Sequence, residues 1–365
     1  MQIKDKNLYY VGGVVRDEIL GAMSLDTDFC YEGNALEFAK SLNIIKTNPD
    51  FGTVRVITDN GKEIDIASTR TETYPKAGHL PVVDKIGCSL KEDLKRRDFT
   101  INAMAKNTLT GEITDYFGGL TDIKEKKLKV LHDNSFIDDP SRIIRGLKFA
   151  VRFGFELEEH TKKLQDEYLD NINYNMSYHR LKKELKETFS LSKEEVFDNF
   201  IEQNIFKLLS KDCKLPEIKL NPTIAISIVY DMQFEINYTY MVYLGLFDLS
   251  NFELNKDELI ILESFNNIRN KKPLSDIEIY KLFNTIPLES VLLYAISVDD
   301  KIAFKYLKEL SHIKIGISGE DLKQLGIPQS KIYKEIFDSV LKEKIKYPKL
   351  SKFEEIEFVK NRYLS

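Results

Sequence analysis

The chain has 365 residues, of which 42% are hydrophobic, and its formal net charge is −5. This length exceeds the usual size of a single hydrophobic core, so we expect two or more domains. The acidic balance argues against a uniformly basic nucleic-acid coat but is compatible with a local basic surface. The charge is uneven, because the 65 residues from Lys301 onward hold fourteen Lys and Arg against nine Asp and Glu.

The spacing of the cysteines and the lengths of the apolar runs indicate in which cellular compartment the protein functions. Cys30, Cys88 and Cys213 are far apart and form no C-x-x-C pair, which disfavours a disulfide framework or a zinc site. The N-terminus, MQIKDKN, lacks an apolar signal core, and no 18-residue apolar run follows. We therefore expect a cytoplasmic protein without a membrane partner.

Residues 8–28 read LYYVGGVVRDEILGAMSLDTD. The apolar run predicts a strand that breaks at Gly12 and Gly13, where missing side chains would let backbone N–H groups approach a phosphate. Arg16 falls on the first turn of the following helix and could donate to the same phosphate. Gly21 is typical of the end of that helix.

Two aspartates follow that helix, Asp26 and Asp28, one residue apart. In an extended segment their carboxylates project from one face, about 6 to 7 Å apart at the backbone. That spacing suits joint coordination of hard divalent cations such as Mg2+. A glycine pair alone is more typical of a turn, and a D-x-D alone is more typical of a solvated acidic pair. The prediction therefore depends on the order of the glycine turn, the Arg and the two carboxylates.

The next strands are predicted at residues 53–58 and 62–69, joined across Asn60-Gly61, a strong hairpin signal. In the second strand Asp65 lies on the face opposite Ile64 and Ile66. Taken by itself, Asp65 either faces water or adds a third carboxylate to the metal site. Residues 35–42 read as a helix, and residues 71–87 read as a loop with two prolines and two glycines.

Ser89 to Glu92 has the form of a capping box that opens a helix carrying RRDFTINAMA, residues 96–105. On this helix Asp98 and Asn102 share a face, with Arg97 beside them. The face offers a cation for phosphate and polar groups for a ribose hydroxyl.

A second polar constellation begins at residues 138–142, DDPSR, where Asp139 and Pro140 suit a helix start. The helix then carries a row at three-residue spacing: Asp139, Arg142, Arg145 and Lys148. An Asp can accept from the exocyclic amine of cytosine or adenine while an Arg one turn away donates to the ring nitrogen. Such a pair would select C and A without a nucleic-acid template.

These motifs resemble a known family. GGVVRD followed by LDTDF is similar to the class II tRNA nucleotidyltransferases and bacterial poly(A) polymerases of the DNA polymerase beta superfamily. EDLKRRDFTINAMA matches a family motif closely, and DDPSR resembles the family's E-D-x-x-R, with Asp138 in place of Glu. Lys148 departs from a common Arg and loses its planar fork. The resemblance covers residues 8–155 strongly and the remainder weakly.

The resemblance implies an α+β multidomain fold, with a polymerase-beta-like head of mixed sheet and helices followed by helical neck, body and tail. The expected boundaries are 1–124 for the head, 125–185 for the base-reading neck, 186–295 for the body and 296–365 for a tRNA-binding tail. Asp26 and Asp28 would hold two Mg2+ ions, and Asp65 would complete the catalytic cluster. The segment 71–87 corresponds to a flexible loop implicated in the switch from CTP to ATP.

The implied activity is template-independent addition of CCA to the 3′ end of tRNA from CTP and ATP. Gly12, Gly13, Arg16 and Arg97 would bind the triphosphate; Asp139 and Arg142 would read the base, and Arg145 and Lys148 would assist. Alternatives are an A-adding or CC-adding partial enzyme, a poly(A) polymerase, an inactive RNA-binding relative, or a nucleotidyltransferase for a small molecule or protein. The sequence does not indicate an oligomeric state.

Overall fold

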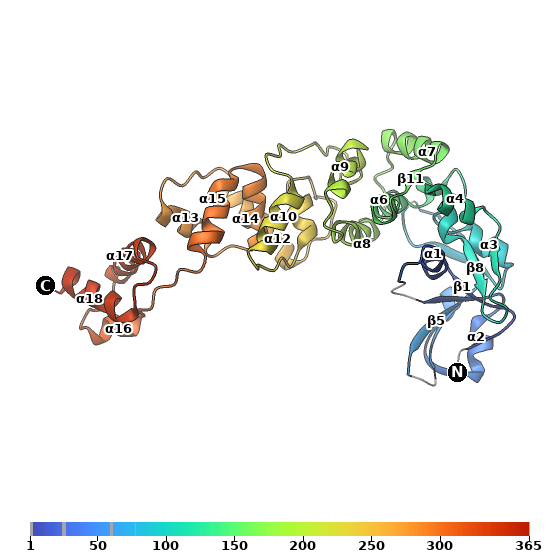
Figure 1. The fold of residues 1–365 in the computed structure, drawn as a ribbon, viewed down its shortest axis with the longest axis horizontal. Helices are drawn as coiled ribbons and strands as arrows, with labels where there is room; N and C mark the ends of the chain where they lie inside the picture. The colour runs from blue at the N-terminus through green and yellow to red at the C-terminus, as the bar shows by residue number, and fades with distance from the viewer. Residues whose placement is uncertain (1–2, 24–26, 59–60, 77, 365) are drawn as a thin grey trace. The chain divides into compact units, whose positions relative to one another are not determined.

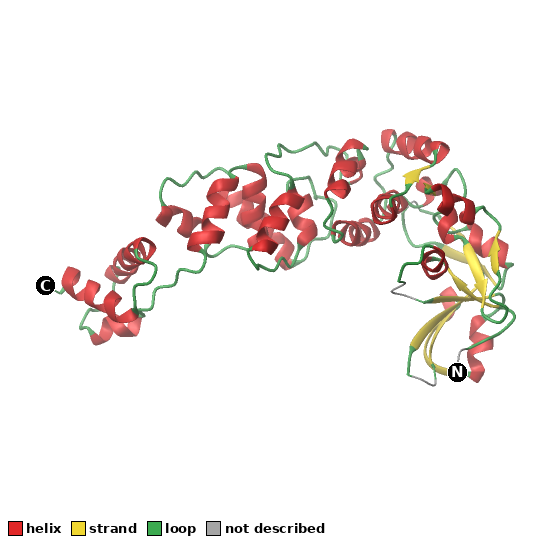
Figure 2. Cartoon of the chain, viewed as in Figure 1, coloured by secondary structure: helices red, strands yellow, loops and turns green. Residues whose placement is uncertain are grey.

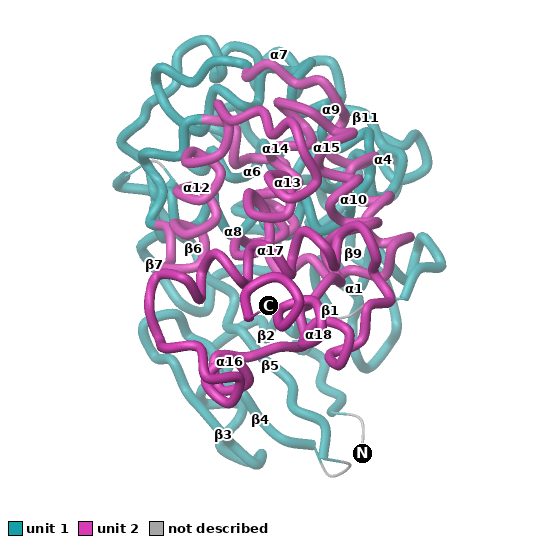
Figure 3. Tube along the Cα trace, turned by 90° about the vertical axis from the view of Figure 1, so that its left-hand side faces the viewer, with its two compact units in different colours: residues 1–215, 248–253 teal, residues 216–247, 254–365 magenta. Residues whose placement is uncertain are grey.

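A computed structural model describes residues 3–23, 27–58, 61–76 and 78–364 of the chain. The chain forms two compact units (Figure 3), one of residues 1–215 and 248–253 and the other of residues 216–247 and 254–365. The strands gather in the N-terminal part and helices make up nearly all that follows (Figures 1 and 2), so the expected fold class is confirmed. The four-domain division stays a prediction.

The first unit is built on a seven-stranded mixed sheet in the order β3-β4-β5-β2-β1-β8-β9. Its strands are β1 (Leu8–Val11), β2 (Asp28–Tyr31), β3 (Asn43–Asn48), β4 (Thr53–Ile57), β5 (Glu63–Ser68), β8 (Met104–Asn107) and β9 (Ile113–Asp115). Neighbouring strands are antiparallel except β2 and β5, which are parallel. Strand β3, which lies at an edge of the sheet, was missed by the sequence reading.

Alternation along the strands divides their side chains between two faces. Phe29, Ile64 and Ile66 enter a core with Ala35 and Ala39, from α2 (Ala35–Phe38) and the 3-10 turn η1 (Ala39–Ser41). Asp28 and Asp65 therefore lie on the opposite face, as the alternation predicted for Asp65. The β4–β5 hairpin is also confirmed.

Residues 71–87, predicted to be a loop, instead begin and end in strands. β6 (Arg70–Thr73) and β7 (Val82–Ile86) pair antiparallel, so the loop is confined to residues 74–81. The sequence signal was weak because the two strands have only four and five residues and form four cross-strand pairs, with a register shift between Thr71 and Glu72. The Arg70 side chain fixes the start of β6 by donating to Glu72 and to the carbonyl of Phe51.

The helix expected to carry residues 96–105 ends earlier. α3 (Leu90–Lys95) opens with the predicted Ser89 capping box, but the chain then forms the 3-10 turn η3 (Thr100–Asn102) and enters β8. Tertiary hydrogen bonding overrides the helical pattern, because the Thr100 N–H donates to the carbonyl of Lys129 and Phe99 bridges Val130. Phe99 is fully buried there.

The rest of the first unit is mainly helical. Its remaining helices and turns are α1 (Gly13–Ile19), η2 (Pro49–Phe51), α4 (Gly119–Glu125), α5 (Ser135–Asp138), α6 (Ser141–Phe153), α7 (Glu159–Asp170), α8 (Tyr178–Phe189), α9 (Glu194–Glu202) and η4 (Ile205–Leu208). A two-stranded parallel sheet of β10 (Lys127–Leu128) and β11 (Glu156–Leu157) interrupts them. The region after residue 125 is therefore not purely helical.

The second unit consists of helices. They are α10 (Pro222–Asp231), α11 (Thr239–Leu244), α12 (Lys256–Ile268), α13 (Asp276–Phe283), α14 (Leu288–Ser297), α15 (Asp300–Lys305), the π-helical turn η5 (Tyr306–Leu310), α16 (Gly319–Gln324), α17 (Ile332–Lys346) and α18 (Lys352–Tyr363). The last three share a core centred on Leu322, Ile336 and Val359. Across the described parts of the chain, each helix is too short or too polar to span a bilayer.

Ile66 and Ile57 offer a matched test of the sheet core. Ile66 on β5 is fully buried, whereas Ile57 on β4 is 38% exposed. We expect Ile66→Ala to reduce the free energy of unfolding by about 2 to 5 kcal/mol, because it leaves a cavity in the core. Ile57→Ala should cost less than about 1 kcal/mol. Urea denaturation followed by circular dichroism measures both; equal midpoints for the two variants would contradict this core.

Candidate active site

The glycine turn lies between β1 and α1. Gly12 has φ of 73°, in the left-handed region, and a Cβ there would come within 3.1 Å of Arg97 Nη1. Any other residue would meet both backbone strain and this cation. Gly21 lies just after α1 at φ of 67°, as predicted for its end. The turn therefore brings the backbone of β1 close to the Arg97 side chain.

One cavity of about 900 Å³ collects most of the residues singled out from the sequence. Of the thirteen predicted site residues, eleven line it: Gly12, Gly13, Arg16, Asp28, Arg97, Asp98, Asn102, Asp139, Arg142, Arg145 and Lys148. Asp65 lines an adjoining cavity of about 400 Å³, and Asp26 lies outside the described residues. Segments more than 100 residues apart thus meet at one site.

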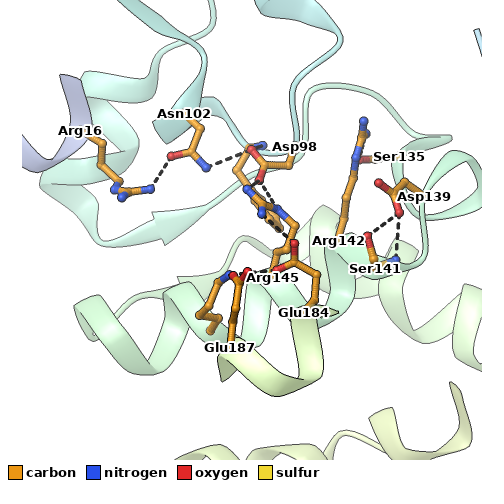
Figure 4. A network of polar contacts seen from close by, with 12 residues as sticks. Arg16, Asp98, Asn102, Ser135, Asp139, Ser141, Arg142, Arg145, Glu184 and Glu187 are labelled. Carbon is orange, nitrogen blue, oxygen red and sulfur yellow. Dashed lines mark hydrogen bonds and ion pairs between the residues drawn. The ribbon is translucent and has the colours of Figure 1, made fainter. Parts of the chain in front are cut away.

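A chain of hydrogen bonds crosses this cavity from the sheet to the helices (Figure 4). It begins at Arg16, which donates from Nη1 to Asn102 Oδ1 at 2.6 Å and from Nε to Asp17 Oδ1 at 2.8 Å. The guanidinium also lies 5.0 Å from the ring centre of Phe149 and 4.6 Å from that of Phe153. Arg16 is 4% exposed, so it contributes positive charge to the wall while several of its donors serve the protein.

Asp98 is the next link. Its Oδ1 accepts from Asn102 Nδ2 at 2.9 Å and from the Phe99 N–H at 2.8 Å, and its Oδ2 accepts from Arg145 Nε at 2.8 Å. Burial alone would raise the pKa of Asp98, but the Arg145 charge and these hydrogen bonds hold the pKa well below its usual range. The carboxylate is therefore kept ionised at the junction between the sheet and α6.

The network of hydrogen bonds ends on α8. Arg145 also donates to Glu184 Oε1 at 3.1 Å, and Lys148 Nζ lies 2.9 Å from Glu184 Oε2 and 2.7 Å from Glu187 Oε2. Burial would lower the pKa of Arg145, but the charges of Asp98 and Glu184 raise it overall. Glu184 thereby fixes two of the predicted cations from a neighbouring helix (Figure 4).

The proposed base-reading residues lie at the start of α6. Helix α6 begins at Ser141, whose N–H and Oγ both donate to Asp139 Oδ1, at 3.1 and 2.6 Å. The prediction of Asp139 as the N-cap and Pro140 as the first helical residue is wrong by one position, because Pro140 is the N-cap; Asp139, one residue earlier, still accepts from the first helical N–H. The second oxygen, Oδ2, accepts from Arg180 Nη2 at 2.6 Å.

Arg142 is held beside Asp139 and is equally buried at 3% exposure. Its Nη1 donates to Ser135 Oγ at 2.7 Å, and its Nη2 donates to the carbonyl of Arg96 at 3.0 Å and to Tyr74 Oη at 3.3 Å. The guanidinium is thus fixed from three elements. This gives the pair a defined orientation before any ligand binds.

The loop between β6 and β7 is fastened to the same helices. The Gly78 N–H donates to the carbonyl of Asp138 at 2.9 Å, and Arg180 Nη1 donates to the carbonyl of His79 at 2.8 Å. Because Arg180 also binds Asp139, one side chain connects this loop to the proposed base-reading pair.

Two of the three aspartates predicted for the catalytic cluster, Asp28 and Asp65, lie on neighbouring strands. In the parallel pairing of β2 with β5, Asp28 is the partner of Asp65. Arg55 donates to both oxygens of Asp65 at 2.8 Å, and this hydrogen bonding lowers the pKa of Asp65. Among the described residues, which exclude Asp26, there is no group of three His, Cys, Asp or Glu placed to hold a metal. The Asp28–Asp65 pair still offers the oxygen donors that Mg2+ prefers.

Several residues that shape the site were missed by the sequence reading. They are Asp17, Tyr74, Arg96, Arg152, Arg180, Lys183, Glu184 and Glu187. Arg152 was predictable from the sequence, because it extends the cationic row of α6 by one more turn. Arg180 and Glu184 lie four apart on α8, where a surface ion pair was the simpler interpretation.

The glycine turn, the carboxylates of the sheet and the cationic cavity thus lie together in the first unit. Residues 8–129 match the Poly A polymerase head domain family. This match confirms the resemblance that was predicted from the motifs of the chain.

Relatives bear different names within this family. An A-adding tRNA nucleotidyltransferase of Aquifex aeolicus is 49% identical over 164 residues, covering 43% of this chain and only 20% of the relative. The A-adding tRNA nucleotidyltransferase of Halalkalibacterium halodurans is 29% identical over 353 residues, covering 90% of this chain and 82% of the relative. A solved CCA-adding enzyme in an apo form has a TM-score of 0.78 at 27% identity, covering 96% and 91% of the two chains. Other solved CCA-adding enzymes hold ATP, CTP or tRNA.

The Asp98–Arg145 pair predicts a pH dependence of stability. A carboxylate whose pKa is depressed in the folded protein adds stability above its unfolded pKa of about 3.9, and this stability is lost as the pH falls toward the folded pKa. Asp98→Asn removes the titrating group but preserves the shape. We expect the variant to be less stable than the wild type by a constant amount above about pH 5, and this difference to shrink below about pH 4. Urea midpoints at several pH values measure it; a difference independent of pH would contradict the assignment.

Proposed function

We propose that this protein transfers nucleotides from CTP and ATP to the 3′ end of tRNA without a nucleic-acid template, releasing pyrophosphate. The observation that carries the proposal is the single cavity that combines Asp28 with a cationic wall and the Asp139–Arg142 pair. Binding of a triphosphate needs Asp28 and the cationic wall, and selection between bases needs the Asp139–Arg142 pair. The match to the Poly A polymerase head domain supports the same chemistry.

The triphosphate is assigned to the part of the cavity nearest the glycine turn. Arg97 is held there by Asp93 at 3.2 Å, and its buried Nε has no hydrogen-bond partner in the described structure. A phosphate oxygen would satisfy such a donor. Arg16 and Lys148 would add charge to the same wall, and Asp98 and Asn102 would lie near the ribose.

The base is assigned to Asp139 and Arg142. Asp139 Oδ2 accepts from Arg180 and retains a further lone pair for an exocyclic amine. Cytosine and adenine supply that amine, whereas uracil and guanine present a carbonyl to the carboxylate. Because hydrogen bonds to Ser135 and Arg96 fix Arg142, the pair would act as a rigid template for C and A.

The acidic residues of the sheet are assigned to metal binding and to the reacting hydroxyl. Asp28, together with Asp26, would hold Mg2+, and Asp65 would complete the cluster. When bound, Mg2+ would supply charge that steadies the triphosphate and the leaving pyrophosphate and favours ionisation of the RNA 3′-hydroxyl. The lysine-rich segment from Lys301 onward would contact the tRNA.

Addition of the whole CCA sequence is the first candidate, supported by solved CCA-adding enzymes that resemble nearly the full chain. Addition of A alone is the second, favoured by the name of the Halalkalibacterium halodurans relative. Incubating the protein with tRNA lacking CCA, ending in CC, or ending in CCA, with each nucleotide singly, separates these from CC addition and poly(A) synthesis. Absence of incorporation in every combination would leave an inactive RNA-binding relative or an enzyme with another acceptor.

Asp28→Asn tests the acidic site. We expect incorporation to fall by about a thousandfold or more, because loss of metal stabilisation is worth several kcal/mol in the transition state. RNA binding, measured by filter retention, should persist. Asp50→Asn is the matched control, since Asp50 lies exposed on η2 of the same unit. Full activity of the Asp28 variant would overturn the assignment.

Asp139→Asn tests base selection. The amide keeps an oxygen for the Ser141 N–H and Oγ, gives up the ion pair with Arg180, and replaces an acceptor with a donor that suits the carbonyl of uracil. We expect the preference for CTP over UTP to drop about tenfold or more, measured as the ratio of kcat/KM values. Asp133→Asn, at an exposed aspartate bound to His160, serves as the control. Unchanged nucleotide preference in the Asp139 variant would contradict the template.

A further inference from the structure

A second cavity adjoins the first on the same face of the sheet. It measures about 400 Å³ and shares Asp28 and Arg97 with the larger cavity. Its other walls come from β3, β4 and β5. The proposed nucleotide site accounts for one side of the carboxylates, and this smaller cavity occupies the other.

Four charged residues form a row across this cavity, each opposite the next on neighbouring strands. Lys46 pairs with Arg55, Arg55 with Asp65, and Asp65 with Asp28, which gives a row from β3 to β2. With strands about 4.8 Å apart, three such steps span about 15 Å of backbone. The charge changes sign halfway, so a cationic end faces an acidic end. We call these four residues the cross-strand row.

The cationic end of the cross-strand row, Lys46 and Arg55, lies beside further polar residues and so differs from an ordinary solvated surface. All six residues of β3 are exposed, and Lys46 lines the cavity with Thr47, Asn48 and Thr53, of which Asn48 and Thr53 are cross-strand partners on the same face as Lys46 and Arg55. Among the described residues, none forms an ion pair or a side-chain hydrogen bond with Lys46. Aligned hydroxyl, amide and ammonium donors suit a sugar–phosphate backbone, which carries a negative charge at each step.

The other cations of the cavity already have protein partners. Arg55 binds Asp65, Arg70 binds Glu72 at 2.7 Å, and Arg97 binds Asp93. Lys46 is therefore the cationic side chain of this cavity that can bind an anion without breaking one of these ion pairs. Arg55 lies between that position and the carboxylates, where it can contact the same anion at its edge.

We propose that the smaller cavity binds the 3′-terminal nucleotides of the acceptor RNA along the cross-strand row. The terminal hydroxyl lies at the Asp28–Asp65 end, and the preceding phosphate lies against Lys46. Arg55 positions Asp65 through its two hydrogen bonds and neutralises its charge toward the RNA. This assignment rests on the proposed function, because it places the acceptor across the carboxylates from the nucleotide.

Steady-state kinetics with a CC-ending tRNA and ATP test the role of Lys46. We expect Lys46→Ala to raise the KM for RNA about threefold and Lys46→Glu about tenfold, with the dependence of RNA affinity on salt reduced by roughly 0.7 in log–log slope. The KM for ATP should not change. Lys40→Ala is the control, since Lys40 is an exposed lysine of the same unit that pairs with Glu37 outside the cavity. An unchanged KM for RNA in Lys46→Glu would overturn the proposal.

A protection experiment tests the placement without relying on activity. Acetic anhydride acetylates an accessible lysine Nζ and releases acetate. We expect a CC-ending tRNA to reduce acetylation of Lys46 about threefold or more in the wild-type protein and to leave acetylation of Lys40 unchanged, measured by peptide mass spectrometry. Equal acetylation of Lys46 with and without the tRNA would contradict the placement.

The two experiments separate this inference from the proposed function. If the wild-type protein incorporates no nucleotide but the tRNA protects Lys46 from acetylation, the transferase assignment fails and the RNA site stands. If incorporation occurs but Lys46 is not protected and Lys46→Glu has a normal KM for RNA, the transferase assignment stands and this site fails.

Discussion

The buried ion pair between Asp98 and Arg145 joins the sheet-based part of the first unit to its helices. Arg145 lies on α6, while Asp98 lies on the turn between α3 and η3. Removing two such charges from water is costly, and the pair is stable only because Asn102, the Phe99 N–H and Glu184 satisfy the remaining hydrogen-bonding groups. The wall of the large cavity depends on this arrangement, since the same network fixes Arg16 and Lys148.

Interactions local in sequence were predictable. The glycine turn, the hairpin around Asn60-Gly61 and the Ser89 capping box each depend on a few consecutive residues, and the hairpin and the capping box appear as expected. The cationic row of α6 was predictable from helical periodicity, and family resemblance supplied the expectation that distant motifs would share one site. Eleven of the thirteen residues predicted in this way line the large cavity. Their individual roles stay predictions.

Features set by distant contacts were not predictable. The helix beginning at Leu90 ends at Lys95 because residues 99–100 bond to residues 129–130, which no local pattern records. Strand β3 and the β6–β7 hairpin lack strong alternation and form through pairing with their neighbours. Arg180 has the appearance of a surface arginine in sequence, yet tertiary packing gives it two partners, Asp139 and the carbonyl of His79.

The parallel pairing of β2 with β5 ties chemistry to strand register. Side chains alternate with a period of two, so a slip by one residue would place Ile64 or Ile66 beside Asp28 and turn Asp65 toward the buried core. The β4–β5 hairpin likewise sets which residue of β5 lies opposite Arg55. The number of residues that join the two strands is therefore under functional constraint, and a single inserted residue there would move Asp65 away from Arg55 without changing either residue.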